Sequence, residues 1–238
     1  MGSPGGVSNL TPKQRLVVGI ALPLFALFVS LSLWNGLRAA WGDASTLSAR
    51  WLVAEWRENR GPGFTPALWI QTRNDLRNGL KITPDNPQIY DDLGYLHASR
   101  AQSIGITEAN TPLGEYQRQL LDDAIGYYRQ ATTLRPTLPY SWVYLAQAKE
   151  LRGHMDTELW HAFDKALKLG TGEAAVRYVL VEIACTHWAL LPTERQSNIT
   201  RLVQVTPEHH RSKLLSVIKA TNCPIATASQ PALPPARP

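Results

Sequence analysis

Two pairs of adjacent carboxylates, Asp91-Asp92 and Asp122-Asp123, are the residues of this sequence best suited to acid–base chemistry. Such chemistry requires carboxyl groups that converge on one proton of a substrate. Adjacent residues of a helix, however, point about 100° apart. Carboxylates in the first turn of a helix are also stabilised by the helix dipole. We therefore interpret both pairs as solvated helix turns and not as catalytic groups.

A cysteine nucleophile is the second possibility, because Glu182 and His187 lie close to Cys185 in the sequence. The thiol would need a base that converges on it and a third group that orients the base. Residues two positions apart on a helix face away from each other, which separates Cys185 from His187. The other close histidines are His154 with His161 and His209 with His210. They lack a third ligand at metal-binding spacing, so the sequence predicts no metal site, no cofactor and no enzyme.

The two cysteines, Cys185 and Cys223, leave two interpretations open. Their wide spacing excludes a zinc ribbon and a thioredoxin-like redox motif. In an exported domain they could form a disulfide. Otherwise one is a buried thiol and the other a loop thiol.

The charges of the chain argue against nucleic-acid binding. The net charge is +5, with 24 Lys and Arg against 19 Asp and Glu. The basic residues are scattered, and no run of five or more occurs, whereas nucleic-acid-binding proteins gather basic residues in a stripe or patch. Charged residues make up 18% of the chain. This share is below the usual quarter and indicates a buried or membrane segment.

An uncharged stretch from Leu16 to Leu37 has the length of a membrane span, and Arg38 follows it. A helix of about 20 apolar residues crosses a hydrocarbon core of about 30 Å. The alternative is a cleaved signal peptide, whose apolar region is shorter and ends at a small-x-small site. Gly42-Asp43-Ala44 matches such a site weakly, so we predict an uncleaved transmembrane signal anchor over residues 13–38.

The basic residues around this stretch predict its orientation. Lys13 and Arg15 precede it, whereas Arg38 stands alone after it. Because basic residues favour the cytoplasmic side, we expect the N-terminus in the cytoplasm and the rest of the chain outside. In a Gram-negative bacterium this means a protein of the inner membrane with a periplasmic domain.

The segments that flank the main domain have simpler compositions. Residues 1–12 are rich in Gly, Ser and Pro and predict a flexible cytoplasmic tail. Residues 43–83 predict two leading helices, the first capped at Asp43 or Ser45. Residues 224–238 are rich in Pro and Ala, which is typical of a disordered tail.

Residues 84–222 predict a tetratricopeptide-like (TPR-like) repeat domain. A TPR repeat has about 34 residues and forms two helices, with small and aromatic residues at fixed positions. The first copy contains Tyr90, Leu93, Gly94, Ala124, Tyr128, Ala131 and Pro136. The second copy contains Trp142, Leu145, Phe163 and Ala166. The small residues let two helix backbones approach closely while the aromatic rings fill the space beside them.

One departure from the repeat lies between the two helices of the first copy. The additional residues centre on 101–117, so either the helices are longer or a loop is inserted near residues 110–114. A buried helix is expected at 173–188, and two amphipathic helices at 192–205 and 207–220 would form a closing pair that caps the stack. The predicted fold is therefore all-α: one N-terminal transmembrane helix followed by a TPR-like solenoid of antiparallel helix pairs.

These features resemble the VpsP-like exopolysaccharide biosynthesis proteins of bacteria, and the resemblance covers residues 13–222. The motifs that carry it are the 16–37 anchor, Asp85-Asn86-Pro87 with Tyr90 and Leu93-Gly94, Arg135-Pro136 with Trp142, and Trp188 with Leu191-Pro192 and Arg195. The resemblance implies a membrane-tethered scaffold that is accessory to polysaccharide synthesis or export and binds proteins on the concave face of its solenoid.

The polar first-helix positions Asp91, His97 and Gln147 are the predicted contacts to a protein partner. Two other functions remain open at this point. One is a periplasmic assembly chaperone, for cytochrome maturation, secretion or pilus biogenesis. The other is a glycan-active enzyme built as a helical toroid.

Overall fold

The computed structural model describes residues 11–105 and 111–225, without the side chains of Gln14 and Arg15. Most of the two predicted tails, and Asn110 of the predicted loop, lie outside these ranges. The described residues contain helices and no strand, which confirms the predicted all-α class. The helices are α1 (Pro12–Arg57), α2 (Pro66–Ile82), α3 (Pro87–Ser103), α4 (Pro112–Leu134), α5 (Pro139–Arg152), α6 (Thr157–Leu169), α7 (Ala174–Thr186), η2 (Trp188–Leu190), α8 (Thr193–Gln204) and α9 (Glu208–Ala220).

Helix α1 is continuous over 46 residues, about 69 Å at 1.5 Å per residue. It includes both the predicted anchor and the first leading helix, so the predicted helix start at Asp43 or Ser45 is wrong. No proline or helix-terminating glycine turn separates the two segments, and Ala39 and Ala40 favour helix. The side chains from Leu16 to Leu37 are exposed, and the helix is long and apolar enough to cross a membrane.

Proline and a polar cap mark the start of several helices. Pro66, Pro87 and Pro112 each occupy the first turn, where the missing N–H costs nothing. Thr65 and Asn86 accept hydrogen bonds from backbone N–H groups of the first turn at 3.3 and 3.0 Å. These local signals in the sequence therefore mark where the helices start and where the turns before them lie.

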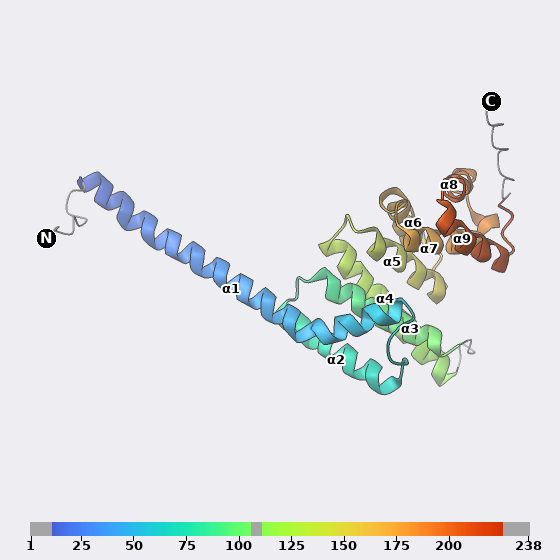
Figure 1. Cartoon of the computed structure of the whole chain (residues 1–238), viewed down its shortest axis with the longest axis horizontal. Coiled ribbons are helices and arrows are strands. Elements are labelled where there is room, and N and C mark those ends of the chain that lie inside the picture. Colours follow the sequence, from blue (N-terminus) through green and yellow to red (C-terminus); the bar gives the residue numbers. More distant parts are fainter. Residues whose placement is uncertain (1–10, 106–110, 226–238) are drawn as a thin grey trace, which may run out of the picture.

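The helices form two layers beside one another (Figure 1). The second half of α1 packs on α2, α3 packs on α4, and α5 packs on α6. Helices α1, α3, α5 and α7 also contact one another in succession, and we call them the first layer. Helices α2, α4 and α6 each pack against two helices of the first layer, and we call them the second layer. The apolar half of α1 projects away from both layers (Figure 1).

The predicted repeat positions pack closely between α3 and α4. Leu93, Ala124, Tyr128 and Ala131 are at most 2% exposed. A Cβ on Gly94 would lie 2.7 Å from the ring of Tyr128, so glycine is required for this approach. The second pair buries Leu145, Phe163 and Ala166 in the same way, while Tyr90 and Trp142 are partly exposed and Pro136 is exposed.

Helix α4 joins two apolar cores. One core lies between α1 and α4 and includes Val53, Leu76 and Leu120. The other extends from α4 to the segment after α9 and includes Tyr128 and Leu180. The first repeat has more residues between His97 and Ala124 than a TPR repeat has. They lengthen both of its helices, since α3 has 17 residues and α4 has 23.

Candidate partner-binding surfaces

The pair Asp91-Asp92 lies inside the first layer of helices and not on a solvated turn. The two residues are 5% and 2% exposed. Asp92 accepts from Gln88 at 3.1 Å and pairs with Arg57 of α1 at 3.0 Å. Asp91 accepts a 2.9 Å hydrogen bond from Ser141 of α5. The solvated interpretation is wrong for this pair because α1 and α5 both pack against α3 and cover it.

Burial dominates the electrostatics of this cluster. It raises the pKa of Asp91 to about 6, although the hydrogen bond from Ser141 and the charge of Arg57 act in the opposite direction. It also raises the pKa of Asp92, again against Arg57. The Arg57 guanidinium lies 5.0 Å from the ring centre of Tyr95 and donates to the Asp91 carbonyl oxygen at 3.1 Å. The cluster therefore ties α1, α3 and α5 together.

The second carboxylate pair is exposed, as the sequence predicts, but it lies in the middle of α4 and not in the predicted first turn of a helix. Asp122 accepts two hydrogen bonds from Arg152 of α5 at 2.9 and 3.3 Å. Asp123 accepts one from Gln119 at 3.1 Å. Both carboxylates hold surface contacts between or within helices.

Two of the three predicted partner contacts lie inside the chain. Asp91 is buried as described, and His97 is 3% exposed. The His97 Nδ1 lies 2.8 Å from the Leu93 carbonyl oxygen, and its ring packs against Trp69 and Tyr127 at 5.4 and 5.1 Å. This corrects the prediction for Asp91 and His97, because neighbouring helices cover them, whereas Gln147 is partly exposed on α5.

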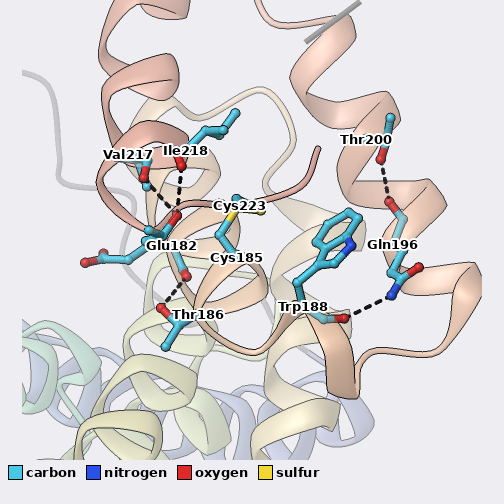
Figure 2. The surroundings of a disulfide bond; sticks show 10 residues. Glu182, Cys185, Thr186, Trp188, Gln196, Thr200, Val217, Ile218 and Cys223 are labelled. Carbon is cyan, nitrogen blue, oxygen red and sulfur yellow. Dashed lines mark hydrogen bonds between the residues drawn. A yellow bond between two sulfur atoms is a disulfide. The ribbon is translucent and has the colours of Figure 1, made fainter. Parts of the chain in front are cut away.

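Cys185 and Cys223 form a disulfide, one of the two interpretations that the sequence left open. Figure 2 shows the bond between α7 and the segment that follows α9. The Cα atoms are 5.0 Å apart, which is an ordinary separation for a disulfide. Next to it, Gln196 of α8 donates to the Trp188 carbonyl oxygen at 2.9 Å. The disulfide occupies Cys185, and His187 lies against Glu150 instead, at 3.1 Å.

A groove of about 600 Å³ lies between α6 and α8. Its apolar lining consists of Leu167, Pro192, Leu202 and Val205. Its polar lining consists of Asp164, Lys168, Thr171, Glu194, Arg195, Asn198 and Arg201. A lining of apolar side chains beside charged ones suits a segment of protein with one apolar and one polar side.

Two cations on the rim are available to a ligand. Arg195 is engaged, because it donates to both carboxylate oxygens of Asp164 at 2.9 and 2.8 Å and lies over Trp160. Lys168 and Arg201 are exposed and have no ion-pair partner in the part of the chain that the structure describes. The groove therefore offers positive charge beside apolar surface.

The groove between α6 and α8 was not predicted from the sequence. Leu167 and Leu202 lie on helices that α7 separates in the chain, so no local spacing relates them. The described residues also contain no group of three or more His, Cys, Asp or Glu side chains that could hold a metal ion.

The base of the anchor is attached firmly to the helical domain. Arg38 pairs with Asp85 at 3.5 Å, and Asn86 donates to Asp43 at 3.4 Å. A Cβ on Gly42 would lie 2.6 Å from Thr83, so α1 lies directly against the turn between α2 and α3. These contacts fix the direction in which the apolar half of α1 leaves the domain.

In comparisons with known proteins, no protein-family model matches the chain, and no curated protein matches it. The function of the chain is therefore inferred from the residues and surfaces described above.

Proposed function

We propose that this chain is a membrane-tethered scaffold that holds a protein partner in the groove between α6 and α8. The observation that carries the proposal is the groove itself. It is lined by apolar side chains and by the cations Lys168 and Arg201, which form no ion pair with a carboxylate of the described residues. The fitting partner is an amphipathic segment with apolar side chains and at least one carboxylate. Grooves between helices bind such segments through apolar anchors, and complementary charge sets their orientation.

The packing of the helices supports a TPR-like arrangement of the domain. Successive pairs contact one another, and Gly94 and Tyr128 interlock as that repeat requires. In such stacks each pair packs only on its neighbours, which leaves extended surfaces for recognition. This favours a binding protein over an enzyme.

The exposed apolar half of α1 supports a single membrane span as the tether. The basic residues before it and the disulfide after it favour a cytoplasmic N-terminus and a periplasmic helical domain, since disulfides persist in the periplasm. A phosphatase fused after residue 222 should then be active, and an inactive fusion beside an active cytoplasmic reporter would contradict this topology.

The resemblance to VpsP-like proteins supports a partner from exopolysaccharide synthesis or export. The competing function is a periplasmic assembly chaperone. Capture of partners from solubilised membranes separates the two, because a chaperone would retain haem-handling, secretion or pilus proteins in place of polysaccharide components.

The groove is tested by charge reversal in the full-length chain. Lys168→Glu combined with Arg201→Glu should lower partner capture at least tenfold. The matched control is Lys165→Glu, because Lys165 is an exposed lysine of the same helix that does not line the groove. Equal capture by both variants would place the partner elsewhere on the protein.

A further inference from the structure

From Leu33 to Trp56, helix α1 has two faces of mostly apolar residues, one buried and one exposed. One face packs on the helical domain and consists of Gly42, Thr46, Ala49, Val53 and Trp56, all buried. The other face, which we call the α1 seam, consists of Leu33, Leu37, Ala40, Ala44, Leu47, Trp51 and Ala54, all exposed. Positions two residues apart lie about 200° around a helix, so the two faces are nearly opposite.

The α1 seam has the spacing of a coiled-coil core. Its residues alternate by four and three positions, which is the heptad pattern of helices that pack side by side. It carries no charged residue, and Leu37, Leu47 and Trp51 are 68%, 68% and 59% exposed. The same spacing continues into the membrane segment through Gly19, Pro23, Ala26 and Ser30.

With the proposed membrane span ending near Leu37, the hydrocarbon core would not reach the outer part of this seam. Trp51 lies 14 residues beyond Leu37 on a continuous helix, about 21 Å past the end of the apolar stretch. The contacts of Gly42 and Arg38 with the turn after α2 hold this part of α1 on the domain. The seam therefore stands in water as a row of large and small apolar side chains, an exposed surface that marks an interaction site.

We propose that a second copy of this chain covers the α1 seam, so that two α1 helices pair in parallel across and above the membrane. Two copies inserted in the same direction present identical seams, which is what a twofold interface requires. The small residues Ala40, Ala44 and Ala54 allow close approach, while Leu47 and Trp51 fill the spaces between them.

Charge complementarity supports this occupant. Arg50 and Glu55 flank the seam on opposite sides, five residues apart. Within one chain Arg50 pairs with Asp43 at 3.0 Å and Glu55 with Arg60 at 3.2 Å, so pairing between two copies would exchange these surface partners. These are the two flanking positions that face each other between the helices of a parallel coiled coil. Arg50 of one copy would thus lie against Glu55 of the second. The inference rests on the proposed membrane tether but not on the groove between α6 and α8.

Oxidative crosslinking of single-cysteine additions to the full chain in native membranes tests the proposal. The two native cysteines are bonded to each other and do not compete. Ala44→Cys, on the seam, should give a disulfide-linked dimer. The control is Ser45→Cys, because Ser45 is exposed but points about 100° away from the seam, and it should crosslink at least tenfold less.

A second variant separates specific pairing from chance encounters. Leu47→Glu places a charge on the seam without touching the buried face, and it should lower crosslinking of Ala44→Cys at least tenfold. Equal crosslinking at residues 44 and 45, no effect of Leu47→Glu, or a crosslink to a different protein would overturn the proposal. Carbonate extraction in the same experiment tests the tether separately, because a chain that leaves the membrane contradicts the proposed function itself.

Discussion

Gly94 sets the distance between α3 and α4, and substitution tests this directly. In Gly94→Ala the new Cβ would lie 2.7 to 2.9 Å from ring atoms of Tyr128, which is 2% exposed and cannot move aside. Overpacking of this kind costs about 1–3 kcal/mol, more than the gain of about 1 kcal/mol in helix propensity. We expect a lower free energy of unfolding, measured by urea denaturation of the full chain in detergent.

Gly126 of α4 provides the matched control for that measurement. It is also helical, but a Cβ there would meet nothing within 4 Å. Gly126→Ala should therefore raise the free energy of unfolding by up to about 1 kcal/mol. Equal effects of the two substitutions would show that the ring of Tyr128 does not limit the approach of the helices.

Asp91 should make stability depend on pH. Its pKa in the folded chain is about 6, above the ordinary value of 3.8, because burial disfavours its charge. The protonated form is the one that folding favours, so its stabilising contribution is present below about pH 4 and is lost as pH rises through 6. Each unit of pKa shift corresponds to about 1.4 kcal/mol, which makes the full effect on the order of 2–3 kcal/mol.

The measurement compares the wild-type chain with Asp91→Asn at pH 4.5 and pH 8. The amide of the substituted side chain does not ionise, so the variant should gain stability over the wild type as pH rises. Ser141→Ala should extend the wild-type dependence to higher pH, because the hydrogen bond from Ser141 lowers the pKa of Asp91. A difference between wild type and Asp91→Asn that is constant with pH would contradict the assignment.

The disulfide fixes the last helices on α7. Cys185 and Cys223 are 38 residues apart, and a closed loop of this length corresponds to about 4 kcal/mol of stabilisation in the chain-entropy model. In the double variant Cys185→Ala, Cys223→Ala, amide hydrogen exchange should accelerate in α8 and α9. Exchange in α2 and α3 should stay unchanged because they belong to the other core. Uniform acceleration in every helix would show that the chain unfolds as one unit.

The helix starts could be predicted from sequence because their signals are local. Thr83-Pro84, Thr193 and Pro207 mark turns and starts that the structure also shows. The continuity of α1 was not predicted, because Asp43 and Ser45 are good cap residues, yet in the structure the helix runs through both of them. The repeat spacing predicted the packing positions Gly94 and Tyr128. It did not predict the burial of Asp91, because Arg57 contacts Asp91 from α1, which is distant in the sequence.

At the scale of the whole molecule, α1 is one continuous helix whose first half is apolar and long enough to span a membrane and whose second half packs on the domain. Its apolar half is exposed, and its second half is held between Arg38 and Trp56 by α2 and α3. A flexible linker would let the domain rotate freely above the membrane. A continuous helix instead fixes both the height of the α6–α8 groove and its direction relative to the tether.

Insertions after Leu37 test this rigidity, because the contacts of Arg38 and Asp43 with the turn after α2 lie beyond that point. Each added residue turns the domain by about 100° around the helix axis. Two inserted alanines should therefore place the seam below the insertion and the seam above it on opposite sides. Cysteines at positions 33 and 44 then cannot crosslink in the same dimer.

Seven inserted alanines are the control, since a whole heptad restores the phase of the seam while it lengthens the helix by about 10 Å. This variant should crosslink at both cysteines, as the chain without an insertion should. Alanine is chosen because it preserves the helix. Crosslinking at both positions in the two-residue variant would mean that α1 bends or unwinds near the insertion. Helix α1 would then not fix the direction of the domain relative to its apolar half.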